Sequence, residues 1–328
     1  MKRPIALLLV VAASSTALAG GSNYNVAPGT LASVKGSVAE WDVPTPQFAR
    51  DPAPAPDGTI YIAVMQGNKI AHFDPRTRKF REWDLPPGAR PHGLVVDKQG
   101  IVYYTGNGNG TIGRLDPATG KVTEYRAPSG GSPHTIVQAP DGMLWFTVQD
   151  GRVGKLDPRS GNITEFATRG GPYGLAIAKD GAVWFCQLSG DRLGRVDPAT
   201  GKVTEVEVES GSGPRRVAAS ADGSILWFAF YGSNELVKFD PIAQKIGKAY
   251  KLPAGKRGGA YAVTIDGAGN PWVNEFGANT VVHFDAATEK MQVVKLPTPN
   301  TGIRKMIVAA DGRLWYMGSH TGKIGVIE

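Results

Sequence analysis

The chain has 328 residues, of which 41% are hydrophobic, 43 are glycine and 24 are proline. This balance fits many tight turns around a large β core. The single cysteine, Cys186, excludes an internal disulfide bond, and we interpret it as a small buried residue because no basic neighbour is identified. The formal net charge of +7 suits a partner that is nucleic acid, an anionic surface or an acidic ligand.

Residues 1–19 are the first predicted segment, a signal peptide. Lys2 and Arg3 precede a short apolar run, and small residues predict cleavage after Ala19. The apolar run is too short to anchor the protein in a bilayer. We therefore expect a periplasmic or secreted protein with no membrane anchor, in which residues 20–36 form a flexible lead-in. Export argues against a nucleic-acid partner, and removal of the two cationic residues lowers the net charge from +7 to +5.

Residues 37–328 contain seven repeats of a unit of roughly forty residues. Each copy has an Asp-Gly turn or a variant of it, followed by a strand with an aromatic residue. The turns start at Asp57, Gln99, Asp141, Asp180, Asp222, Ala268 and Asp311. The aromatic residues are Tyr61, Tyr103, Trp145, Trp184, Trp227, Trp272 and Trp315. Between the turns, short alternating segments indicate four antiparallel strands per unit. We predict an all-β fold, a seven-bladed β-propeller in a single domain, because no linker interrupts the repeats.

The ends of the repeat region predict how the ring closes. The seventh copy stops at residues 324–328, which form its third strand, so its fourth strand is missing from the C-terminus. The missing strand is found at residues 38–44, whose sequence matches residues 80–86. We expect this N-terminal strand to complete the last blade, which leaves no open seam in the ring. A closed ring has no obligatory partner surface, so we expect a monomer.

Two positions of the repeat meet at one mouth of the expected channel, because the first strand of a blade starts where the second strand ends. The first position is occupied by Arg50, His92, His134, Tyr173, Arg215, Tyr261 and Arg304. The second position is occupied by Val64, Gly106, Val148, Gln187, Phe230, Glu275 and Gly318. Arginine offers cationic forked donors, tyrosine a stacking surface and histidine a proton-exchanging group. We predict a cationic mouth that binds a small polar or anionic ligand; the alternative is that these residues only line a wet channel.

The repeats also carry several short motifs. They are Pro91-His92-Gly93, Pro133-His134-Thr135, Leu144-Trp145-Phe146-Thr147, Ile112-Gly113-Arg114 and Val122-Thr123-Glu124-Tyr125. Together they resemble the virginiamycin B lyase family of seven-bladed propellers. The resemblance implies a carbon–oxygen lyase of the streptogramin B lyase type, which opens a cyclic depsipeptide antibiotic by elimination and so confers antibiotic resistance.

The resemblance also implies a histidine base and a Mg²⁺ ion that polarises the substrate. His92 and His134 match the two histidines of the family as candidate bases, and Arg50 would be a neighbouring electrophile. Where the family has glutamates, this chain has Gly106, Val148 and Gln149. Glu275 and Gln149 are then the weak candidates for a metal site.

Two functions of different classes remain open. In the first, the protein is an enzyme with His92 or His134 as base, and Tyr173 packs against a cyclic ester. In the second, it is a non-catalytic periplasmic propeller that holds an anionic metabolite, peptide or glycan. The ligand-binding residues would be Arg50, Tyr173, Arg215, Tyr261, Glu275 and Arg304. A gluconolactonase-like hydrolase is a further alternative, which would need a Ca²⁺ cluster built around Glu275.

Overall fold

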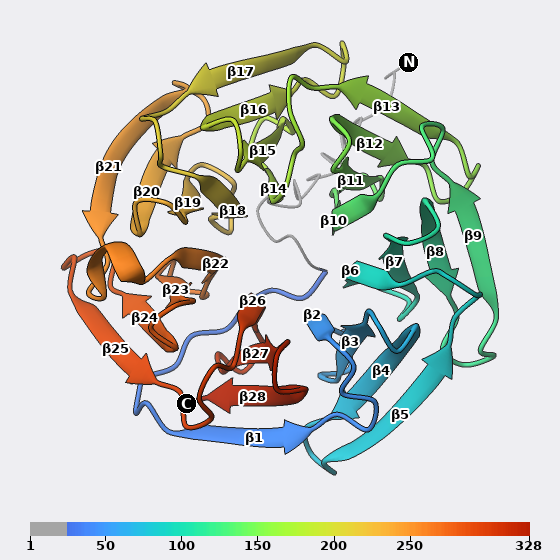
Figure 1. The fold of residues 1–328 in the computed structure, drawn as a ribbon, viewed down its shortest axis with the longest axis horizontal. Helices are drawn as coiled ribbons and strands as arrows, with labels where there is room; N and C mark the ends of the chain where they lie inside the picture. Colours follow the sequence, from blue (N-terminus) through green and yellow to red (C-terminus); the bar gives the residue numbers. More distant parts are fainter. Residues whose placement is uncertain (1–24) are drawn as a thin grey trace, which may run out of the picture.

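The computed structural model describes residues 25–328, which form seven four-stranded antiparallel sheets arranged in a ring (Figure 1). The predicted seven-bladed β-propeller is therefore confirmed. Within these residues the only helix is a short 3₁₀ turn, η1 (Gly255–Arg257), and no helix is long and apolar enough to cross a bilayer. The expected signal peptide and its cleavage site lie outside the described residues.

The blades follow one another along the chain. Blade one contains β2 (Ala49–Pro54), β3 (Ile60–Val64), β4 (Lys69–Asp74) and β5 (Lys79–Asp84). Blade two contains β6 (Pro91–Val96), β7 (Val102–Gly106), β8 (Thr111–Leu115) and β9 (Val122–Arg126). Blade three contains β10 (Pro133–Gln138), β11 (Leu144–Val148), β12 (Arg152–Leu156) and β13 (Ile163–Ala167). Blade four contains β14 (Leu175–Ile177), β15 (Val183–Gln187), β16 (Arg192–Val196) and β17 (Val203–Glu207).

The remaining three blades complete the ring. Blade five contains β18 (Pro214–Ala219), β19 (Leu226–Phe230), β20 (Glu235–Asp240) and β21 (Lys245–Lys251). Blade six contains β22 (Ala260–Ile265), β23 (Pro271–Glu275), β24 (Thr280–Phe284) and β25 (Met291–Lys295). Blade seven contains β26 (Ile303–Val308), β27 (Leu314–Gly318), β28 (Lys323–Ile327) and β1 (Val38–Asp42). The seven first strands, β2 to β26, surround the axis, and we call the space between them the central channel.

The predicted closure by the N-terminal strand is confirmed. β1 pairs antiparallel with β28, with Val38 opposite Ile327 and Asp42 opposite Lys323. The carboxylate of Glu40 accepts a hydrogen bond of 2.7 Å from the hydroxyl of Tyr316. Both chain ends therefore contribute to one blade, and the ring has no unpaired seam.

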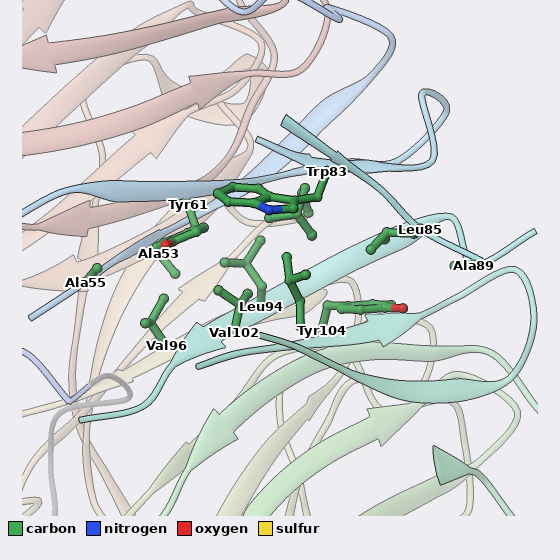
Figure 2. Close-up of a cluster of buried hydrophobic side chains, with 13 residues drawn as sticks. Ala53, Ala55, Tyr61, Trp83, Leu85, Ala89, Leu94, Val96, Val102 and Tyr104 are labelled. Carbon is green, nitrogen blue, oxygen red and sulfur yellow. The ribbon is translucent and has the colours of Figure 1, made fainter. Parts of the chain in front are cut away.

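The hydrophobic core is divided among the interfaces between neighbouring blades. Figure 2 shows the cluster between blades one and two, in which Tyr61 and Trp83 of blade one lie over Leu94 and Val102 of blade two. Within this cluster, the first strand of blade one contributes the small Ala53, whereas Tyr61 and Trp83 come from its second and fourth strands. This taper follows from the geometry of a propeller, because neighbouring sheets diverge with distance from the axis.

Residues 25–36, part of the segment 20–36 that we expect to be a flexible lead-in, are hydrogen-bonded to the ring. Asn25 donates a side-chain hydrogen bond of 2.9 Å to the carbonyl of Val96, at the end of β6 away from the mouth. The backbone of Gly29 donates to Ala309 and accepts from Gly267. Figure 1 shows this segment running from the centre of the ring past β26 to β1. The lead-in therefore crosses the end of the channel that lies opposite the mouth.

Candidate functional site

The first strands are bulged where they begin, at the mouth of the channel. In six blades the pairing between the first and second strands shifts there, as between Pro133 and Ile136 of β10. A bulge places two residues opposite one and re-aims their side chains. The outer ring is the set Arg50, His92, His134, Tyr173, Arg215, Tyr261 and Arg304. The inner ring is the set of following residues, Asp51, Gly93, Thr135, Gly174, Arg216, Ala262 and Lys305.

Polar side chains of the second strands fix the first strands of neighbouring blades. The hydroxyl of Thr105 in blade two accepts from the backbone of Gly93 and donates to the carbonyl of His134, both at 2.8 Å. Thr147 in blade three donates to the carbonyl of Tyr173 at 2.9 Å. In blade six, Asn274 donates to Ile303 of the next blade at 3.1 Å. The outer ring is thus positioned by a hydrogen-bond network that links one blade to the next.

The two histidines of the outer ring form a buried pair. Their ring centroids are 3.6 Å apart, and the ring of Tyr173 lies 4.1 Å from that of His134. Burial lowers the pKa of both histidines well below the usual value, and the nearby Arg50 and Arg216 lower it further. Both imidazoles are therefore neutral at neutral pH. His134 shares a hydrogen bond of 3.0 Å between Nδ1 and the hydroxyl of Thr135.

The opposite arc of the outer ring combines two tyrosines with two arginines. The hydroxyl of Tyr173 is hydrogen-bonded to that of Tyr261. Arg215, from the blade between them, donates to the Tyr261 hydroxyl at 3.0 Å and lies 3.8 Å from the centre of its ring. Arg304 donates to the same hydroxyl at 3.1 Å. The structure thus brings Tyr173, Arg215, Tyr261 and Arg304 into one hydrogen-bonded group, which contacts the histidine pair through Tyr173.

A set of aromatic side chains surrounds the mouth, and these were not predicted from the sequence. Phe48 lies 5.3 Å from the guanidinium carbons of both Arg50 and Arg304. Tyr231 and Phe276, directly after β19 and β23, contact Arg215 and Arg304 respectively. Phe48 has φ of 52°, a left-handed conformation that bulky residues rarely adopt and that often marks a functional site. The mouth therefore offers cations backed by aromatic faces.

The inner ring adds a buried charged network that the sequence analysis missed. Arg216 donates to the hydroxyl of Thr135 at 2.7 Å and lies 3.6 Å from the carboxylate of Asp51, on the other side of the channel. Burial and Arg216 lower the pKa of Lys305 to about 8, although Asp51 opposes the change. The one sequence signal for Asp51, Arg216 and Lys305 is that charged residues stand where other blades have Gly, Ala or Thr, and this signal does not show that they face the channel.

The two rings together are strongly cationic. Their charged side chains are Arg50, Arg215, Arg216, Arg304, Lys305 and Asp51. Asp51 is the one carboxylate of the two rings, and Arg216 lies against it. A buried surplus of guanidinium groups is unfavourable unless an anion balances it, so the arrangement suits a negatively charged ligand.

Glu275 and Gln149 are not brought to the rings in the way a metal site would need. The carboxylate of Glu275 accepts hydrogen bonds from Asn234, the backbone of Ala254 and Thr280, at 2.7 to 3.0 Å. Gln149 is an exposed residue after β11. Within residues 25–328 no group of three or more His, Cys, Asp or Glu side chains could hold a metal ion. Arginines flank the histidine pair, so the residues present do not fit the implied Mg²⁺ or a Ca²⁺ cluster.

Below the inner ring, the lead-in crosses the far end of the channel. A cavity of ≈ 50 Å³ lies there, lined by Val26 and Pro28 of the lead-in and by Arg216 and Lys305 above. This volume accommodates a few water molecules.

Comparisons with known proteins agree with the architecture. The model of the virginiamycin B lyase family matches residues 29–170 and 130–328. A streptogramin B lyase structure has a TM-score of 0.82 and 26% identity, covering 89% of this chain and 97% of the other. A virginiamycin B lyase from Staphylococcus aureus has a TM-score of 0.80 and 23% identity over 89% of this chain and 98% of its own.

A hydrazine synthase from Kuenenia stuttgartiensis has the same fold, with a TM-score of 0.73 and 17% identity over 90% of this chain and 99% of the other. The search of curated proteins found no match. The similarity to the lyases thus extends over the whole ring. The hydrazine synthase shares only the fold.

Proposed function

Since this chain belongs to the virginiamycin B lyase family, we propose that its central channel is its functional site and that the mouth binds a small anionic ligand. The observation that carries the proposal is the charge of the two rings, in which four arginines and Lys305 stand against Asp51 alone. Among these cations, Arg50 gives the strongest support for an anionic ligand. It is buried, and its Nε and Nη2 atoms have no hydrogen-bond partner among residues 25–328. A carboxylate or phosphate group would satisfy such a forked donor.

The shape of the mouth supports the same proposal. Arg215 and Arg304 are only partly buried, so both side chains keep some exposed surface. Phe48 and Phe276 provide flat apolar surface beside them. We infer that the ligand combines an anionic group with an apolar or planar part, as in a small metabolite, a peptide or a glycan derivative. We also propose that the mature protein is exported and acts as a monomer.

Thermal unfolding with added succinate, citrate or phosphate tests the binding proposal. We expect the Tm of the wild type to rise with at least one of these anions, because binding stabilises only the folded state. The Arg50→Gln and Arg304→Gln variants should lose this increase, whereas His134→Ala should lose less of it. Arg76→Gln is the matched control, because Arg76 is exposed on blade one and pairs with Asp74. Equal losses in all four variants would contradict the proposal.

Elimination on a cyclic ester is the second candidate function, and the neutral histidine pair is the observation that favours it. In this reaction a base removes a proton beside the ester, its electron pair forms a double bond, and the C–O bond breaks. His134 or His92 would accept the proton, and Arg50 would stabilise the negative charge that develops. The hydrogen bond to Thr135 would orient the ring of His134.

Linearisation of a streptogramin B antibiotic tests the second candidate. Turnover by the wild type that falls at least a hundredfold in His134→Ala would support a histidine base. The assay is run with Mg²⁺ supplied and again with EDTA, and Arg76→Gln serves as the control. If the wild type shows no turnover when Mg²⁺ is supplied, the protein is not an antibiotic lyase.

A further inference from the structure

The hydroxyl oxygen of Tyr261 lies within hydrogen-bond distance of two guanidinium groups and of a second phenol. Arg215 and Arg304 donate to it from 3.0 and 3.1 Å, and the hydroxyl of Tyr173 is hydrogen-bonded to it as well. If Tyr261 were neutral, its proton would have to point at Tyr173, whose oxygen already accepts from Arg215 at 3.3 Å. The proton of Tyr173 would then have no acceptor among residues 25–328. If Tyr261 is deprotonated, its oxygen can accept from both arginines and from Tyr173, so each of these three donors has an acceptor.

We propose that Tyr261 is a phenolate at neutral pH and serves as the built-in counter-anion of the channel. We further infer that an anionic ligand binds at the mouth together with one proton, which neutralises this phenolate. The second statement rests on the proposed anion-binding function, whereas the first does not. The proton comes from water or buffer and forms an O–H bond on Tyr261, while the ligand anion takes over the pairing with the arginines, so charge and atoms balance.

The surroundings of Tyr261 favour its negative charge from every side. Arg215 and Arg216 lie on β18, Arg304 on β26 and Arg50 on β2, while the other ionisable groups that face it are Tyr173 and Tyr231. Burial alone would raise the pKa of Tyr261, but the four arginines lower it to about 7. Among residues 25–328 no carboxylate is hydrogen-bonded to its hydroxyl, and the inner-ring carboxylate of Asp51 pairs with Arg216.

A near-ultraviolet absorbance titration tests the phenolate directly, without any ligand. We expect the wild type to gain one tyrosinate with a midpoint at about pH 7, and Tyr261→Phe to lack this step. Tyr231→Phe is the matched control at the same mouth and should retain it. Should Tyr261→Phe fail to fold, Arg304→Gln should shift the step to higher pH. The absence of any tyrosinate below about pH 9 in the folded wild type would overturn the proposal.

Calorimetric titration with sulfate tests the coupling, because sulfate itself exchanges no proton in this range. Measured in two buffers of different ionisation enthalpy, binding should take up close to one proton above pH 8. The apparent affinity should weaken about tenfold per pH unit above the midpoint, and this dependence should vanish in Tyr261→Phe. Sulfate binding without proton uptake overturns the coupling but not the proposed function. A tyrosinate step without binding of any anion overturns the proposed function and the coupling, but not the phenolate.

Discussion

At the scale of single residues, the two buried histidines make stability depend on pH. Burial and neighbouring arginines hold the pKa of His92 and His134 below the unfolded value of 6.5. As the pH falls below 6.5, protons bind to these histidines in the unfolded chain first, so the folded state loses stability. For each histidine that stays neutral in the folded state, the free energy of unfolding falls by about 1.4 kcal/mol with each pH unit below 6.5.

Urea denaturation at pH 7 and pH 5 tests this account. We expect His134→Gln to lose less stability than the wild type between these two values, because it removes one histidine that must stay neutral. The free energies of unfolding at pH 7 are measured for both proteins to correct for lost packing against Tyr173. An identical pH dependence in wild type and variant would show that burial does not control the proton affinity of this residue.

Sequence reasoning could predict the outer ring but not the inner ring, and the reason is physical. Repeats align the position of Arg50, His92 and their equivalents, whereas ordinary alternation would turn the next residue away from the axis. The bulge aims this next residue at the channel as well, as for Arg216. Glu275 occupied a matching position in the repeat, but its partners lie between blades five and six. Contacts of this kind depend on packing between blades, which the sequence does not display.

At the scale of the strands, a pairing rule connects the second and third strands of several blades. A glycine in the third strand lies beneath an aromatic ring of the second, as Gly154 lies beneath Phe146. A β-carbon added at Gly154 would come within 2.2 Å of that ring. In blade one the corresponding pair is Ala71 and Ile62. Isoleucine is smaller than an aromatic residue, so it leaves room for the β-carbon of Ala71. The glycines in the repeated Gly-Arg and Gly-Lys motifs are therefore explained by packing rather than by backbone conformation.

The pair of Phe146 and Gly154 offers a test by double-mutant cycle. Gly154→Ala should lower the free energy of unfolding by about 1 to 3 kcal/mol, because it overpacks the blade. Adding Phe146→Ile, which reproduces the pair found in blade one, should recover a large part of that loss. Denaturant unfolding of the two single variants and the double variant measures this. A Gly154→Ala variant as stable as the wild type, or no recovery in the double variant, would contradict the pairing rule.

At the scale of the whole molecule, the fold turns seven similar units into one asymmetric site. The strand pairing of β1 with β28 and the turn sequences followed directly from the repeat, so the architecture was predictable. The path of the lead-in across the channel was not predictable, because backbone hydrogen bonds such as those of Gly29 leave no pattern in the sequence. This segment crosses the far end of the channel, and arginines and aromatic rings converge at the opposite end, the mouth.

The central claim is that this mouth binds anions, and the most direct measurement is a crystal structure with selenate, whose selenium is located by anomalous scattering. The account predicts a selenate ion within hydrogen-bond distance of the outer-ring arginines, such as Arg50 or Arg304, and its loss in crystals of Arg304→Gln. Selenate found only on the outer faces of the blades, with the mouth free of it in the wild type, would contradict the claim.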